Sequence, residues 1–267
     1  MYYSRIGELV RKFTLFFGLR ISKTTDVQSL HNFFSKVTPV ECDKKLIRIG
    51  GEFDGGYLVP DDFEGIEECY SPGVSLISNF EDELTKKGIV CFMSDYSVDG
   101  PLIENKLFNF QKKFLGVKND GVFIRLDEWI RNTSKSDSDK ILQMHIEGAE
   151  WSVLCTTPPD ILEKFRIIVL EVHGMDGLFD PMIFRQINDT FDLLIDKFKI
   201  VHIHPNNSSR PISAKGFSVP PVMEFTFLRS DRVKNIKNSV AFPHHLDSPN
   251  VKEMRDYPLP RSWYKSK

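Results

Sequence analysis

Three segments of the sequence carry pairs of titratable side chains with one residue between the members of each pair. The pairs are His145 with Glu147, Glu171 with His173, and His202 with His204. Residues i and i+2 of a β-strand face the same side, so an extended segment presents both members together. Histidine exchanges a proton near neutral pH and carboxylates bind hydroxyl groups, which suits general base catalysis on a hydroxyl-bearing acceptor. Metal ligation, or histidines that merely satisfy buried backbone groups, would also explain the pairs.

Within this set, the proton acceptor is expected to be His173 or His145, with a slight preference for His173. Glu147 and Glu171 are assigned to the same catalytic group. Glu150 opens a predicted helix, where a first-turn carboxylate is expected to be structural. The spacing matches no metal motif such as HExxH, so a metal ion is compatible with the cluster but not favoured. Substrate contacts are assigned to the polar residues that follow: His204, Asn206 and Glu224.

The first half of the chain has features of a site for a nucleotide-like ligand. Gly73 follows a predicted strand in the run YSPGVS, where it permits close approach of the backbone to a ligand. Asp95 follows the next predicted strand, where a carboxylate can accept both hydroxyls of a ribose. A complete GxGxxG motif is missing, which argues against dinucleotide binding. The run DGGY at residues 54–57 is explained equally well by a hairpin turn and by a ligand-binding loop.

The elements that must position these residues alternate between strands and helices after about residue 67, which predicts an α/β sheet. Helices are predicted at 80–87, with Asn79 as N-cap, at 126–131, from 151, and at 181–197. The connection 205–221 is rich in Asn, Ser and Pro without a helical period, so the last two strands should be antiparallel. The strands are expected at residues 68–71, 89–93, 141–146, 166–172, 199–204 and 222–229.

Composition limits the class of protein. The chain has 267 residues, 41% hydrophobic and 27% charged, which is typical of a globular protein with a sizeable core. A net charge of −2 gives no general attraction to nucleic acid. The four cysteines lie far apart without a CxxC pair, which favours reduced thiols and a cytoplasmic protein. A membrane span needs about 20 apolar residues, and no such stretch occurs.

Several motifs together resemble the FkbM-type S-adenosylmethionine-dependent methyltransferases, above all the bacterial members that modify surface-polysaccharide sugars. The resemblance covers residues 48–229 and rests on RIGGEFDGGYLVPDD, YSPGVS, NFEDEL, LDEWI and HIEGAEW. It implies S-adenosylmethionine as methyl donor and a Rossmann-like class I methyltransferase sheet, mostly parallel with one reversed C-terminal strand and flanked by helices. The family usually has aspartate where this chain has His145.

The resemblance also implies how the donor is held. Gly73 would abut its amino-acid end, Glu81 would begin the helix after the glycine loop, and Asp95 would hold the ribose. The cofactor-binding set is completed by four further residues: Asp54, Gly56, Tyr57 and Asn79.

The sequence therefore predicts a cytoplasmic O-methyltransferase acting on a carbohydrate hydroxyl, in a nucleotide-activated sugar or a polysaccharide precursor. Residues 1–66 are expected to form a helical and loop region packed on the core, and residues 67–267 the methyltransferase domain, in one globular unit. The alternatives are a non-catalytic binding module in glycan synthesis and a metal-dependent form of the same transfer. The expected partner is a small-molecule or oligosaccharide sugar, without nucleic acid or a transmembrane segment, and a homo-oligomer is compatible with the sequence.

Overall fold

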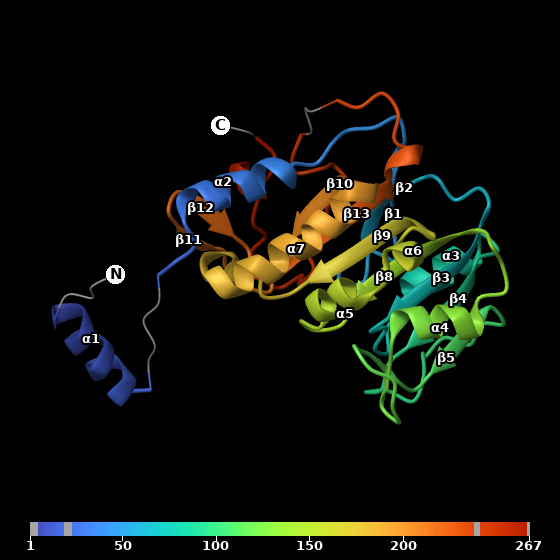
Figure 1. Cartoon of the computed structure of the whole chain (residues 1–267). Coiled ribbons are helices and arrows are strands. Elements are labelled where there is room, and N and C mark those ends of the chain that lie inside the picture. Colours follow the sequence, from blue (N-terminus) through green and yellow to red (C-terminus); the bar gives the residue numbers. More distant parts are fainter. Residues whose placement is uncertain (1–4, 19–22, 238–240, 266–267) are drawn as a thin grey trace.

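A seven-stranded sheet forms the centre of the molecule (Figure 1). The computed structural model describes residues 5–18, 23–237 and 241–265. The strands lie in the following order: β10 (Phe198–Pro205), β13 (Met223–Arg229), β9 (Phe165–Val172), β8 (Asp139–His145), β3 (Ile66–Pro72), β4 (Val90–Ser94) and β5 (Phe108–Gln111).

The direction of the strands confirms the predicted fold class. The pairs β3–β4, β4–β5, β3–β8 and β8–β9 are parallel, whereas β13 is antiparallel to both β9 and β10. One reversed strand inserted next to the end of an otherwise parallel sheet is the Rossmann-like arrangement of class I methyltransferases. The antiparallel pairing predicted for the last two strands is correct.

Two apolar layers cover the sheet. On one face the core includes side chains from α2 (Val27–Lys36), α4 (Leu126–Thr133), α5 (Glu150–Thr156), α6 (Pro159–Leu162) and α7 (Pro181–Lys197), and Figure 1 shows α7, α5 and α4 in front of the strands. On the other face lie α3 (Asn79–Thr85) and the hairpin of β1 (Leu46–Ile49) and β2 (Tyr57–Pro60). The buried strand β9 contributes to both layers, with Ile168 and Leu170 on the first face and Ile167 and Val169 on the second.

The remaining elements are short. They are the hairpin β11 (Ile212–Ala214) with β12 (Phe217–Val219), the parallel pair β6 (Phe114–Leu115) with β7 (Phe123–Ile124), and the 3₁₀ turns η1 (Met175–Phe179), η2 (Ser230–Arg232) and η3 (Arg261–Trp263). The strands β1, β2 and β5 were not predicted. For α3, the residue before the helix is Ser78 rather than the expected N-cap Asn79, and no side chain caps it.

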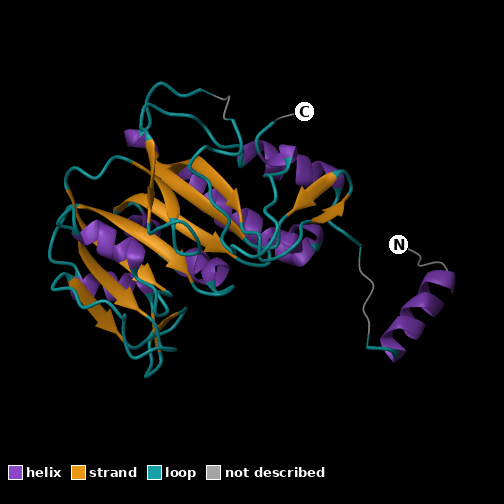
Figure 2. Ribbon diagram, turned by 180° about the vertical axis from the view of Figure 1, so that it is seen from behind, coloured by secondary structure: helices purple, strands orange, loops and turns teal. Residues whose placement is uncertain are grey.

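The first helix, α1 (Arg5–Phe16), lies apart from the rest of the molecule in both views (Figures 1 and 2). Its side chains Leu9, Phe13 and Phe16 are 66–84% exposed. Within residues 1–66, α2 and the β1–β2 hairpin contribute side chains to the two core layers, whereas the apolar side chains named for α1 are exposed. None of the helices in the described part of the chain has the length and apolar character needed to span a membrane.

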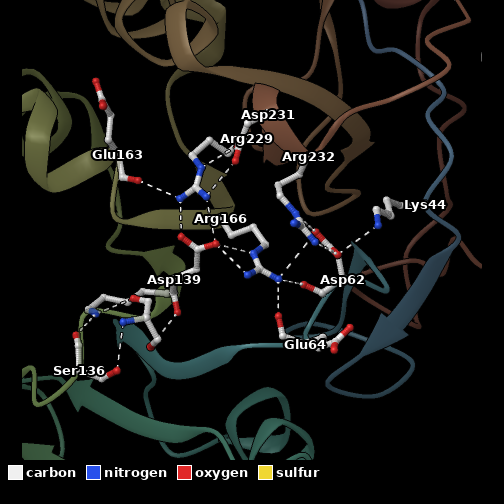
Figure 3. A network of polar contacts seen from close by, with 12 residues as sticks. Lys44, Asp62, Glu64, Ser136, Asp139, Glu163, Arg166, Arg229, Asp231 and Arg232 are labelled. Carbon is white, nitrogen blue, oxygen red and sulfur yellow. Dashed lines mark hydrogen bonds and ion pairs between the residues drawn. The ribbon is translucent and has the colours of Figure 1, made fainter.

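A network of ion pairs lies at the end of the sheet where β8 and β9 begin (Figure 3). Asp139 accepts hydrogen bonds from Arg166 at 2.8 Å and from Arg229 at 2.6 Å and 3.0 Å. Although burial acts to raise the pKa of Asp139, the two guanidinium groups lower it below its usual value. Arg232 binds the buried Asp62 through two contacts of 2.7 Å and 2.8 Å. These ion pairs link the strands at this end of the sheet, whereas the candidate site lies at the opposite end, where the parallel strands have their carboxyl ends.

Candidate active site

A cavity of about 610 Å³ lies at the carboxyl ends of β3, β4 and β8. The sheet order changes direction between β3 and β8, and ligands of open α/β sheets bind at such a point. The volume falls within the range of pockets that enclose small-molecule ligands, roughly 300–1,000 Å³. Eight of the predicted site residues line the cavity: Asp54, Tyr57, Gly73, Asn79, Glu81, Asp95, His145 and Glu147.

The tip of β3 has a conformation that requires glycine. Gly73 has φ +85°, and a Cβ atom at this position would lie 1.6 Å from the carbonyl oxygen of His145. Its N–H donates to the carbonyl of Ser94 at 2.9 Å. The close approach expected at Gly73 is thus made to the neighbouring strand β8 rather than to a ligand. The end of β3 therefore lies between the ends of β4 and β8, and all three strand ends border the cavity.

Asp95 lies directly after β4 and is only 6% exposed. One carboxylate oxygen accepts the N–H of Ser75 at 2.9 Å, and the other accepts the N–H and the hydroxyl of Ser97 at 2.8 Å and 2.6 Å. A carboxylate has about four lone-pair positions, so three bonds leave one acceptor position towards the cavity. Asp95 can therefore shape its loop and still bind a ligand hydroxyl.

Glu81 starts a chain of buried polar contacts that crosses the floor of the cavity. Its carboxylate contacts the hydroxyl of Ser71, which also lies 2.6 Å from Oε1 of Gln143. Gln143 donates to the hydroxyl of Tyr57, which donates in turn to Oε2 of Glu171, both at 3.3 Å. Burial raises the pKa of Glu81 to about 7. Serine has a single hydroxyl proton for its two acceptors, so a protonated Glu81 supplies the second hydrogen bond.

His145 is the imidazole that faces the cavity. Its Nε2 lies 3.1 Å from Oε1 of Glu147, and its Nδ1 lies 3.6 Å from Oε2 of Glu171. The buried Glu171 also accepts from Nδ2 of Asn206 at 2.8 Å, and burial raises its pKa above the usual value. The buried carboxylate of Glu171 thus lies on the Nδ1 side of the ring, and the more exposed Glu147 lies on the Nε2 side.

His173, the preferred base in the sequence analysis, is placed beside His145 and does not line the cavity. The two rings lie 5.3 Å apart with an angle of 26° between their planes. Burial acts to lower the pKa of His173, but the carboxylates of Glu150, Glu147 and Glu171 outweigh it, so the pKa is raised. A raised pKa leaves less of the neutral form that can accept a proton at pH 7. Position in the cavity wall therefore favours His145 over His173 as the candidate base.

The turn after β8 is fixed by Glu150. This buried carboxylate accepts the N–H groups of Ile146 and Gly148, each at 2.9 Å, which agrees with the structural role expected for it. Glu147 lies between them with φ +56°, a conformation that non-glycine residues seldom adopt. The turn therefore holds the Glu147 side chain outward, 77% exposed, at the entrance beside His145.

The predicted substrate residues form a second layer behind the cavity wall. Across the sheet, His204 on β10 pairs with Glu224 on β13. Glu224 pairs in turn with the predicted catalytic residue Glu171 on β9, which pairs with His145 on β8. Burial raises the pKa of Glu224 to about 7, and its carboxylate accepts from Nδ2 of Asn250 at 2.5 Å. The described walls of the cavity do not include His204, Asn206 or Glu224, so direct substrate contact is not seen for them.

Gly56, the remaining predicted residue, is part of the turn between β1 and β2. A Cβ atom there would lie 2.3 Å from the carbonyl oxygen of Gly51, so the turn itself requires glycine. The hairpin explanation of DGGY is therefore correct for Gly56, while Asp54 and Tyr57 of the same run face the cavity.

Several lining residues were not predicted. Gln143 lies two positions before His145 on the same face of β8, so the i, i+2 rule could have identified it. Ser75 and Ser97 belong to loops without a pattern. Most of the apolar lining follows β3, β5 and β8: Val74, Ile77, Phe80, Phe114, Leu115, Phe123 and Ile146.

The same region offers ligands for a metal ion. One nitrogen or oxygen atom from each of His145, Glu171 and His173 lies within 4.8 Å of the others. These residue types bind divalent transition metals.

Comparison with known proteins gives no family assignment. No family model matches the sequence, and no curated protein matches it. A solved structure described as "Putative hemolysin from Streptococcus thermophilus" aligns with 10% sequence identity and a TM-score of 0.37. The alignment covers 62% of this chain and 61% of that chain, so it spans less than two thirds of either. The candidate function therefore has to be argued from the site.

Proposed function

We propose that the protein is an S-adenosylmethionine-dependent O-methyltransferase that acts on a carbohydrate hydroxyl. The observation that carries the proposal is the single cavity shared by Gly73, Asp95 and His145 at the switch point of a methyltransferase-type sheet. A ribose-binding carboxylate and a proton acceptor are the two groups that such a transfer needs from the protein.

The residues fit the donor by their chemistry. Asp95 has an acceptor position left for a ribose hydroxyl, and the aromatic and aliphatic wall at Phe114, Leu115 and Ile146 suits a purine base. Glu81 and Asn79, at the start of α3, lie where the amino-acid end of the donor would be held. The donor supplies an electrophilic methyl group bound to a sulfonium centre.

The role of His145 is to accept the proton of the acceptor hydroxyl. As the oxygen forms its bond to the methyl carbon, the carbon–sulfur bond breaks, its electron pair stays on sulfur, and the hydroxyl proton passes to Nε2 of His145. Glu171, 3.6 Å from Nδ1, stabilises the resulting imidazolium and orients the ring. Glu147 occupies the position in front of Nε2, so it has to yield to the acceptor, which its exposure permits.

A carbohydrate acceptor is supported by the polar groups around His145 and by the resemblance to FkbM-type enzymes. Exposed carboxylates such as Glu147 and Asp54 are suitable partners for sugar hydroxyls. A metal-dependent form of the transfer is the second candidate, because His145, Glu171 and His173 can share one ion. It predicts loss of turnover on chelation and recovery with a single added divalent ion.

The experiment combines binding with turnover. Calorimetry should show binding of S-adenosylhomocysteine to the wild type, and Asp95→Asn should weaken it at least about tenfold, the cost of one charged hydrogen bond. Asp99→Asn is the matched control, since Asp99 is 95% exposed on the same loop. Absence of binding to the wild type at millimolar ligand would refute the proposal.

Turnover then tests the assignment of the base. With a radiolabelled donor and a panel of nucleotide sugars, His145→Gln should reduce kcat by about 10²–10⁴-fold while leaving donor binding unchanged. His173→Gln, which preserves size and removes charge, should have a smaller effect. Equal loss in both variants would mean that the two imidazoles act as one unit.

A further inference from the structure

A second group of titratable side chains lies outside the cavity, where β10 meets the C-terminal segment of residues 241–254. His202 and His204 face the same side of β10, and Asp247 reaches them from that segment. One nitrogen or oxygen atom from each of the three side chains lies within 4.8 Å of the others. None of the three lines the cavity in the described part of the chain.

The imidazoles of this group are buried, and each of the three side chains has a polar atom without a hydrogen-bond partner. His202 is 3% and His204 4% exposed. Nε2 of His202 lies 2.9 Å from Oδ1 of Asp247, and Nδ1 of His204 lies 3.7 Å from the same oxygen. Nevertheless, Nε2 of His202 and Oδ1 of Asp247, which face each other, have no hydrogen bond of acceptable geometry among the described residues. The same holds for Nε2 of His204, the nitrogen of that ring other than the one measured to Asp247. Buried polar atoms are almost always satisfied, so orphaned atoms gathered in one place indicate an absent partner.

We propose that His202, His204 and Asp247 bind a zinc ion. Zinc takes imidazole nitrogen and carboxylate oxygen at about 2.0–2.2 Å in a tetrahedral arrangement, which separates neighbouring ligand atoms by about 3.3 Å. The two measured separations, 2.9 Å and 3.7 Å, lie on either side of this value. Magnesium and calcium prefer sites made of oxygen alone, so the two imidazoles select a transition metal. The fourth position is left for water.

The surroundings hold the carboxylate in place for this role. The second oxygen of Asp247, Oδ2, accepts the N–H of His244 at 2.7 Å, which leaves Oδ1 to face the two imidazoles. Nδ1 of His244 itself accepts the N–H of Leu246 at 3.2 Å. Supporting contacts of this kind orient metal ligands in known sites.

The ion would join the C-terminal segment to β10. The same segment reaches the cavity rim, because the carbonyl of Asn250 accepts the N–H of Asp54 at 3.2 Å and the carbonyl of Leu246 accepts from Arg48 at 3.5 Å. We therefore infer that the zinc would hold the C-terminal segment against β10 and so support the rim of the cavity. This inference does not rest on the proposed methyl transfer.

The test uses the full chain, stripped with a chelator and then dialysed against micromolar zinc. Elemental analysis should find one zinc per chain, and zinc should raise the melting temperature. His204→Gln and Asp247→Asn should each weaken zinc binding by at least about tenfold. The matched control is His245→Gln, an exposed histidine beside His244, which should bind zinc as the wild type does.

Two results would overturn the proposal. A wild-type chain without stoichiometric zinc would show that the group is only an imidazole–carboxylate ion pair. Zinc that is lost in His245→Gln but kept in His204→Gln would show binding by surface histidines. If the ligand variants fail to fold, cobalt substitution of the wild type decides, because a tetrahedral site gives intense visible absorption bands and their absence contradicts the assignment.

Discussion

Replacing Glu81 with glutamine should change how the stability of the protein depends on pH. Glu81 is 3% exposed, and burial raises its pKa to about 7 from the ordinary value of 4.5. Between these two values the folded chain keeps a proton that the unfolded chain has released. The free energy of unfolding of the wild type therefore falls as the pH rises through this window and is highest below it.

The size of the effect follows from the shift. Each unit of pKa difference corresponds to about 1.4 kcal/mol, so a shift from 4.5 to about 7 amounts to about 3 kcal/mol. Glutamine keeps the size of the side chain and a hydrogen bond to Ser71 but carries no charge at any pH. Relative to the wild type, Glu81→Gln should therefore gain about 3 kcal/mol in stability between pH 4.5 and pH 7.5.

Urea unfolding of both proteins at pH 5, 6, 7 and 8 measures this difference directly. Glu67→Gln is the control, because Glu67 is exposed on β3 and should give a difference that does not change with pH. A constant difference between Glu81→Gln and the wild type would refute the reasoning, since it would mean that the buried carboxyl is already charged at pH 5.

Two further predictions concern stability. Gly73→Ala should lower the free energy of unfolding by at least about 3 kcal/mol, since φ is +85° and the new Cβ would meet the carbonyl of His145. An unchanged melting temperature would show that the backbone at the end of β3 is less confined than described. Asp139→Asn should destabilise by about 2–3 kcal/mol in urea unfolding, because it removes the carboxylate 2.8 Å from the buried Arg166 and leaves only Asp62, at 3.9 Å. In contrast, Asp231→Asn should cost less than about 1 kcal/mol, because Asp231 is 59% exposed beside Arg229. Equal effects of the two substitutions would contradict the importance given to burial.

The sheet could be predicted because most of its strands are short apolar runs that end at Gly, Pro, Asp or His. The edge strand β5 escaped prediction, since its four residues, FNFQ, form a strand only through pairing with β4. The strands β1 and β2 were not predicted either, although their turn was one of the two explanations of DGGY, because each strand has only four residues and packs against the sheet. In both cases tertiary contacts determine the structure more than the local pattern does.

The position of the site could also be predicted, but the roles within it depend on detail beyond the sequence pattern. Gly73, Asp95 and His145 follow strands whose carboxyl ends meet at one edge, so their proximity follows from the fold. His173 lies one residue beyond the end of β9, just before Gly174 with φ +70°, and the ring stacks behind His145 instead of facing the cavity. Glu224 lies on β13, separated from β8 by β9, and its carboxylate accepts from Asn250, which belongs to a segment without any periodic pattern.

The reversed strand β13 has a consequence for how the chain assembles. It is the last strand of the central sheet in sequence, yet it lies between β9 and β10. Until residues 223–229 leave the ribosome, β9 has an open flank and β10 has no neighbour in that sheet to pair with. A chain that stops short of this point would expose two unpaired apolar edges, which are templates for aggregation. We therefore expect the imidazoles of β10 to come together with the rest of the fold only after residues 223–229 have been synthesised.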